Sequence, residues 1–127
     1  MNFYKENKAD AGYDLVAQQG GTVRHGEVTL FDTGVTGNVP PGTVGLVFAR
    51  SGLGVKHGVR PSNAVGVVDP FYEGVIKVGL TRDIAEGEYV VEKGDRIAQI
   101  VFIPLSAYTP GLTSGRGDKG FGSSGVA

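Results

Sequence analysis

Turn-forming glycines divide this chain into short segments, and this feature limits its fold more than any other. Glycine accounts for 22 of the 127 residues and proline for 6, and the glycines are spread along the chain instead of forming a repeat. Turn signals that recur every roughly 8–12 residues between β-branched runs are typical of an all-β sandwich or barrel. We therefore predict an all-β fold with one short helix at most.

Short apolar runs mark the predicted strands. The clearest is 75–80, where Val75, Lys77 and Gly79 alternate with Ile76, Val78 and Leu80 in the period of two that a half-buried strand requires. The helical candidate is 51–57, with Ser51 as its N-cap. The predicted strands are 22–24, 28–31, 44–48, 65–68, 75–80, 88–91 and 96–103.

Charge and composition narrow the function. The net charge is −1, from 12 basic and 13 acidic residues, whereas a general nucleic-acid binder carries a basic excess. The chain has no cysteine, which excludes a disulfide framework and fits the cytoplasm. No signal peptide and no apolar run of about 20 residues are visible, so we expect a cytoplasmic protein with no membrane or nucleic-acid partner. His25 and His57 are isolated and predict no zinc site.

The last residues differ in character from the rest. Residues 111–127 are rich in glycine and serine and cannot bury enough apolar surface to fold alone. We predict a domain over 1–110 and a C-terminal arm over 111–127. The arm is either a tail with no role or a segment that becomes ordered on binding. Arg116, Lys119 and Phe121 favour binding.

Two segments could carry chemistry in the body of the chain. Arg50, Ser51 and Gly52 follow an apolar strand and open the possible helix, so they form either an anion site or an ordinary strand-to-helix turn. Asp69 ends another apolar run just before Pro70. It is either a structural turn residue or a carboxylate that can take a proton from water.

Two further segments lie nearer the C-terminus. Gln99 is a polar residue inside the apolar run of 96–103, so it lies on a solvent-exposed face or reaches a site. Residues 116–125 combine two cations, backbone amides and Phe121, which suit a phosphate-bearing base. This segment lacks the Lys-Ser/Thr ending of a P-loop. Its Arg-Gly-Asp tripeptide also matches a cell-adhesion motif, which we disfavour in a chain without a secretory signal.

Five segments of the chain resemble, in the same order, the five motifs of the trimeric dUTPase family. They are residues 11–15, 50–53, 66–74, 94–99 and 116–125. The resemblance extends over nearly the whole chain. It implies a jelly-roll-like β-barrel that assembles as a homotrimer, with active sites that each draw on all three subunits. It also implies hydrolysis of dUTP to dUMP and pyrophosphate, which lowers dUTP and supplies dUMP for thymidylate synthesis.

The resemblance also implies residue roles. Asp69 is the general base that aligns a water for attack on the α-phosphorus. Tyr72 packs against the deoxyribose and leaves no room for a 2′-hydroxyl. Arg116 clamps the outer phosphates, and the arm stacks Phe121 on the uracil. The remaining substrate-binding residues are Asn63, Gly66, Val67, Val68 and Lys77 for the uracil edge, Arg50, Ser51, Gly52 and Gln99 for the triphosphate, and Gly122 in the arm.

The implied cofactor is Mg²⁺, held mainly by the substrate phosphates. Asp14 either acts on this ion through a water or is a turn residue, and Asp95 is expected to orient an arginine. Pro70-Phe71 and Asp118-Lys119 depart from the usual family pattern, which bears on the hairpin after Asp69 and on the closed geometry of the arm.

Two other functions remain as alternatives. One is a regulatory nucleotide-binding module that has kept the fold. The other is a dCTP deaminase, whose relatives carry a glutamate on the strand after the Asp turn. The corresponding position here is Gly79, so no carboxylate is available for deamination.

Overall fold

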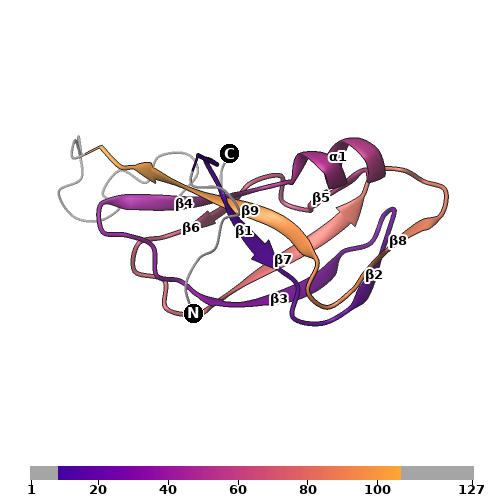
Figure 1. The fold of residues 1–127 in the computed structure, drawn as a ribbon, viewed down its shortest axis with the longest axis horizontal. Coiled ribbons are helices and arrows are strands. Elements are labelled where there is room, and N and C mark those ends of the chain that lie inside the picture. The colour runs from indigo at the N-terminus through magenta and orange to yellow at the C-terminus, as the bar shows by residue number, and fades with distance from the viewer. Residues whose placement is uncertain (1–8, 107–127) are drawn as a thin grey trace, which may run out of the picture.

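The computed structural model describes residues 9–106 (Figure 1). The predicted arm over 111–127, including Arg116, Phe121 and Gly122, lies outside the described residues. Within the described part, nine strands and one helix follow one another along the chain. They are β1 (Tyr13–Val16), β2 (Gly21–Arg24), β3 (Thr29–Thr36), β4 (Thr43–Phe48), α1 (Ser51–His57), β5 (Val59–Pro61), β6 (Gly66–Val68), β7 (Val75–Arg82), β8 (Glu88–Val91) and β9 (Arg96–Pro104).

The strands pair antiparallel in three sheets that do not join into one closed barrel in the described part. The first sheet has the order β1-β9-β4-β6, the second β3-β7-β5, and β2 pairs with β8. In Figure 1 the β4–β9 layer lies above the β3–β7 layer. The mostly β architecture with a single short helix confirms the predicted fold class.

Apolar side chains from both layers meet in one core. In β7, Ile76, Val78 and Leu80 are buried, and Phe31 and Val35 lie at alternate positions of β3. Leu15, Ile97 and Ile100 are the matching core residues of the other layer. The period of two in β3 and β7 explains why these runs form strands, because each strand buries one face and leaves the other less buried.

The structure adds two strands and lengthens several of the predicted ones. Strands β1 and β5 were not predicted, and β5 includes Pro61, a residue that is rare inside a strand. Strand β3 continues past its predicted end because Gly34 adopts a φ of 71°. There the carboxylate of Asp32 accepts the Gly34 N–H at 2.7 Å. This local turn shifts the β3–β7 register without ending the strand.

Helix α1 forms over the predicted residues, but its N-cap is Arg50 and not Ser51. Arg50 has extended backbone angles (φ −85°, ψ 141°), and no side chain caps the helix. The helix ends at Gly58, whose left-handed φ of 66° lets its N–H bond back to Gly54 and Leu53. No helix in the described ranges is long and apolar enough to cross a membrane.

Candidate active site

Two strand edges face each other without pairing, and the candidate site lies between them. Strand β6 is the last strand of its sheet and pairs with β4 alone. Strand β7 pairs with β3 on one side, and with β5 on the other side only over Leu80 to Arg82. The first half of β7 and the outer edge of β6 therefore border a cavity of about 430 Å³.

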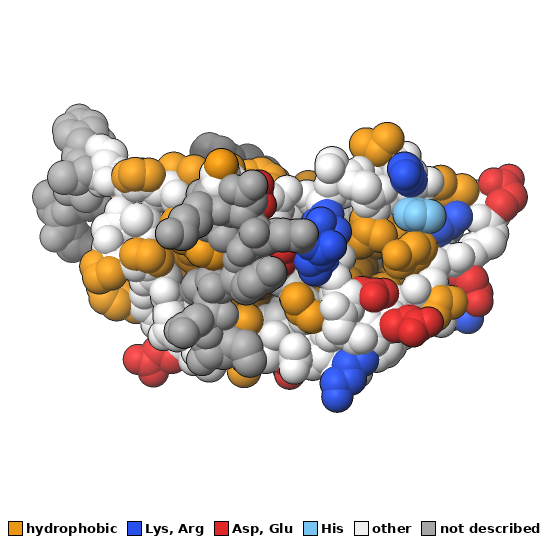
Figure 2. Space-filling model, viewed as in Figure 1, with side chains coloured by type: hydrophobic (Ala, Val, Ile, Leu, Met, Phe, Trp, Pro, Cys, Tyr) orange, Lys and Arg blue, Asp and Glu red, His pale blue; other side chains and the backbone are white. Residues whose placement is uncertain are grey.

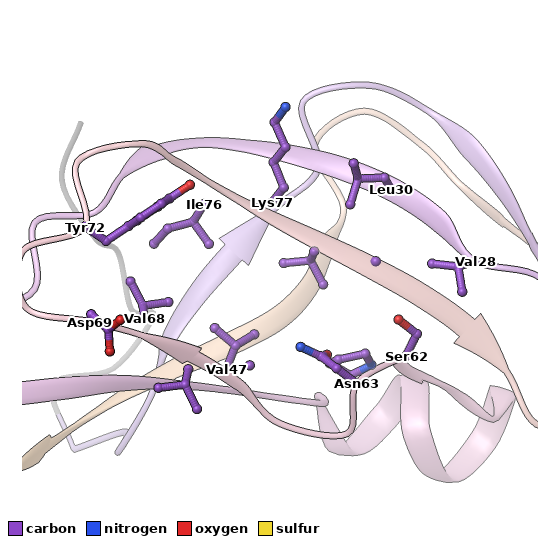
Figure 3. A pocket seen from close by; sticks show the side chains of 15 residues that line it. Val28, Leu30, Val47, Ser62, Asn63, Val68, Asp69, Tyr72, Ile76 and Lys77 are labelled. Carbon is purple, nitrogen blue, oxygen red and sulfur yellow. The ribbon is translucent and has the colours of Figure 1, made fainter. Parts of the chain in front are cut away.

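Polar side chains lie at both ends of this cavity, and its walls between them are apolar (Figure 3). Asp69 and Tyr72 lie at one end, and Ser62 and Asn63 at the other. The Lys77 side chain is exposed and points away from the cavity, so Lys77 borders the cavity with its backbone. The apolar lining includes Val28, Leu30, Val47, Val68, Ile76 and Val78. Apolar walls with a few fixed hydrogen-bonding groups suit a flat ring that has a polar edge.

The turn after β6 presents Asp69. The carbonyl of Asp69 accepts the N–H of Tyr72 at 3.1 Å, which closes the turn and leaves the Asp69 side chain exposed at the cavity end. The hydroxyl of Tyr72 donates to the carbonyl of Val75 at 2.9 Å. Phe71, which lies between Asp69 and Tyr72 in this turn, is 91% exposed and does not line the cavity. A water can therefore reach the Asp69 carboxylate beside the Tyr72 ring.

A second polar cluster forms around Asp14. The side chain of Asp14 is only 14% exposed, and its two oxygens lie 3.6 Å from Arg50 Nε and 3.8 Å from Arg96 Nη1. The β1–β9 register places Asp14 opposite Gln99, and Gln99 Nε2 donates to the carbonyl of Ala49 at 3.0 Å. Gln99 thus fixes the backbone just before Arg50 and does not lie on a fully exposed face.

Beside this cluster the surface is hollowed and cationic. The hollow measures about 440 Å³ and is lined by Arg50, Gly52, Lys56, His57, Tyr89 and Arg96, among others. Figure 2 shows this end of the molecule, where Lys and Arg side chains and a histidine border apolar atoms near α1. Guanidinium and ammonium groups gathered in this way suit an anion such as a phosphate chain.

The cavity and the cationic hollow share no lining residue. The structure brings together seven of the predicted residues in the cavity and most of the others around the hollow. In the cavity are Asn63, Gly66, Val67, Val68, Asp69, Tyr72 and Lys77. Arg50 and Gly52 line the hollow, Ser51 begins α1 between them, and Asp14 and Gln99 contact this region.

The structure gives contacts for two acidic residues of the predicted site. The carboxylate of Asp95 accepts the N–H of Glu92 at 2.9 Å and so holds the turn before β9. Asp14 is the carboxylate that contacts arginines, and it lies in β1 and not in a turn. The partnership with Arg96 could not be predicted from a local sequence pattern, since it depends on the pairing of the unpredicted strand β1.

A resident metal site is not formed by the described residues, which contain no group of three or more His, Cys, Asp or Glu side chains. Asp14 is a single carboxylate already paired with two arginines. This donor set fits an ion that is carried by the phosphates of a ligand. Of the two histidines, His25 has its Nδ1 3.1 Å from the carbonyl of Arg82, and His57 packs on Tyr89 with ring centroids 4.8 Å apart.

Fold and site together define a β-sheet protein with an apolar cavity that ends beside a carboxylate, and with a separate cationic cluster that suits an anion. Comparison with known families agrees with this class. The family model described as dUTPase matches residues 2–125. The chain belongs to the dUTPase family.

Individual relatives support the same assignment. The chain is 44% identical over 126 residues to the deoxyuridine 5′-triphosphate nucleotidohydrolase of Bifidobacterium longum, covering 93% of this chain and 78% of that protein. It is 42% identical over 120 residues to the protein of that name from Solibacter usitatus, covering 91% of this chain and 81% of the relative.

Solved structures of dUTPases show a similar fold, which is jelly-roll-like. The Streptococcus mutans dUTPase superposes with a TM-score of 0.73 at 30% identity, covering 84% of this chain and 88% of that one. The Staphylococcus bacteriophage 80alpha dUTPase gives a TM-score of 0.76 at 26% identity, covering 90% of this chain and 88% of that one. A variant of the bacteriophage protein has been solved with dUpNHpp.

Proposed function

We propose that this chain is a dUTP diphosphatase, which hydrolyses dUTP to dUMP and pyrophosphate. The observation that carries the proposal is the cavity between the unpaired edges of β6 and β7, with Asp69 at its end. Membership of the dUTPase family supports the same reaction. No observation favours a deaminase, because Gly79, which lines the cavity, has no carboxylate to carry a proton.

In this proposal the uracil lies between β6 and β7. The cavity is lined by Gly66, Val67, Val68 and Lys77, and the backbone groups that alternate onto the unpaired edges of β6 and β7 offer donors and acceptors there. Asn63 adds a side-chain amide. Together they form a hydrogen-bonding frame for the edge of the base. A site that hydrogen-bonds its substrate rejects analogues strongly, because a mismatched base leaves buried polar groups unpaired.

Asp69 then acts as the general base. Its carboxylate takes a proton from a water, and the water oxygen attacks the α-phosphorus in line with the bridging oxygen to the β-phosphorus. The bond from the α-phosphorus to that oxygen breaks, so pyrophosphate leaves and dUMP remains. Tyr72 lies at the same cavity end as Asp69 (Figure 3), where the sugar between base and phosphate has to pass.

The triphosphate would bind to the cationic cluster of another subunit. The cavity and the hollow of one chain share no lining residue, which supports a composite site in a homotrimer. Arg50, Ser51, Gly52 and Gln99 of one subunit would hold the phosphates of a nucleotide whose base lies in the cavity of another. The arm, with Arg116, Phe121 and Gly122, would complete the site and exclude water.

Mg²⁺ would arrive on the phosphates and neutralise part of their charge. Asp14 lies beside the cationic cluster, where its carboxylate contacts Arg50 and Arg96. It would therefore meet the ion only through a water, and its direct effect is to orient the two guanidinium groups.

The experiment that tests the function is a pyrophosphate-release assay with Mg²⁺ and dUTP, dCTP, dTTP or UTP offered separately. We expect release from dUTP alone. The variant Asp69→Asn should keep the fold and dUTP binding but lose turnover by at least about 1,000-fold, since its amide cannot accept the water's proton. Release from none of the four nucleotides, or from dUTP at an equal rate by Asp69→Asn, would contradict the proposal.

A further inference from the structure

Two glycines contact the ring of Tyr72 so closely that neither position has room for a side chain. A Cβ added at Gly37 would overlap the carbonyl oxygen of Tyr72 and lie 2.7 Å from its Cδ2. A Cβ added at Gly74 would lie 2.5 Å from the Tyr72 hydroxyl and 2.8 Å from Cζ. Carbon atoms pack at about 3.5–4.0 Å, so a side chain at either glycine would displace the tyrosine.

Backbone contacts fix these glycines beside the ring. Gly37 directly follows β3, is buried, and donates its N–H to the carbonyl of Gly74 at 2.9 Å. The preceding residue, Thr36, pairs with Val75, whose carbonyl accepts the Tyr72 hydroxyl. The end of β3 therefore forms a rigid support for the ring.

The Tyr72 ring can pack here because Gly37 has no side chain, and not because Gly37 has an unusual backbone conformation. Gly37 is not among the described glycines with positive φ, so an alanine would fit its backbone without strain. Tyr72 lines the cavity and Gly37 does not. An atom added at Gly37 would therefore meet Tyr72 from outside the cavity lining, and it would displace both the Tyr72 carbonyl and the ring that borders the space for the sugar.

We propose that Gly37 is a positioning residue that sets the sugar selectivity of the site. Because Gly37 has no Cβ, the Tyr72 ring lies back against the end of β3 and leaves room for a 2′-deoxyribose but not for a 2′-hydroxyl. The inference rests on the proposed function, since it requires the sugar to pass Tyr72. It adds a residue outside the cavity to those that select the substrate.

The variant Gly37→Ala tests this directly. We would measure kcat/KM for dUTP and for UTP with Gly37→Ala and with the native chain. With the ring displaced from its native position, dUTP loses its fit, while UTP, already excluded, has little left to lose. We expect the dUTP-to-UTP ratio of kcat/KM to fall by about tenfold or more. Gly54→Ala is the matched control, because a Cβ there meets only ordinary contacts at 3.8 Å and beyond, and it should keep the native ratio.

A double-mutant cycle separates positioning from a general loss of structure. In a Tyr72→Ala background the ring is absent, so Gly37→Ala should no longer change the ratio. An unchanged ratio in Gly37→Ala, an equal loss for both nucleotides, or the same change in the Tyr72→Ala background would overturn the inference. If thermal unfolding shows that Gly37→Ala does not fold, Gly74→Ala, which displaces the hydroxyl end of the ring, carries the same test. Failure of the native chain to hydrolyse dUTP would instead reject the proposed function.

Discussion

At the scale of single residues, Asp69 and Asp14 differ in how far the sequence could predict their surroundings. Asp69 and Tyr72 are three positions apart in one turn, so a local segment is enough to predict that they act together. The contacts of Asp14 join β1 to Arg50 and Arg96, which are far away in the chain. They depend on the β1–β9 register, and no local pattern encodes it.

The variant Asp14→Asn tests what this carboxylate does. It removes the charge that faces both arginines and keeps the side-chain shape. Because Arg50 and Arg96 are 32% and 41% exposed, water can replace much of the lost interaction, and stability should fall by no more than about 1 kcal/mol. We expect the KM for dUTP to rise about fivefold, which corresponds to about 1 kcal/mol of phosphate binding. Steady-state kinetics at low salt measure the change.

Asp83→Asn is the matched control for Asp14→Asn. Asp83 forms an ion pair with Arg60 at 2.9 Å, and neither residue lines the cavity or the hollow. The control should leave KM unchanged. If Asp14→Asn also leaves KM unchanged, the arginines do not depend on Asp14 for their position.

At the scale of elements, the segments with strong local signals were predicted and the segments defined by their neighbours were not. The alternation in β7 and the short helix over residues 51–57 were both predicted from sequence. By contrast, β5 has three residues and exists because Val59 to Pro61 pair with the end of β7. The same pairing limits β5 to the end of β7, so it leaves the first half of that edge open for the cavity.

Helix α1 offers a prediction about stability. Gly54 lies inside the helix, where glycine costs about 0.5–1 kcal/mol relative to alanine. A Cβ there would find ordinary contacts with Ala49 and Val59. We expect Gly54→Ala to raise the free energy of unfolding by about 0.5–1 kcal/mol, measured by urea denaturation.

Gly58→Ala should have the opposite effect. Gly58 has a φ of 66°, and a Cβ there would lie 3.0 Å from Ile84 Cγ1, so we expect a loss of about 1 kcal/mol or more. Equal effects of the two substitutions would show that the helix contributes nothing specific to stability.

At the scale of the whole molecule, the arrangement of the sheets keeps the two halves of the candidate site apart within one chain. Both halves could be predicted as separate segments, because each has a local chemical pattern. Their separation could not be predicted from composition or periodicity, because it follows from which strands end each sheet. The cavity lies where β6 ends one sheet, and the cationic hollow lies beside α1 and the start of β9.

Subunit mixing tests whether the site is shared. Asp69→Asn inactivates the cavity of its own chain, and Arg50→Ala weakens the cationic cluster of its own chain. If each site takes its cavity from one subunit and its cluster from a neighbouring subunit, a mixed trimer that contains both variants has both parts intact in about one of its three sites. Co-expression with two different affinity tags and purification through both would yield the mixed oligomers, and dUTP turnover would measure the recovery.

The matched control for this mixing combines Asp69→Asn with Tyr72→Ala. Both residues line the same cavity, so every cavity in the mixed oligomer carries one defect or the other, and no fully intact site can form. Activity should then stay at the level of the two parent variants. Recovery in the first mixture and not in the second would locate the base pocket and the phosphate cluster on different chains. If mixed oligomers form and neither mixture recovers, the cavity and the cluster of one site do not come from different chains, and the shared site is rejected.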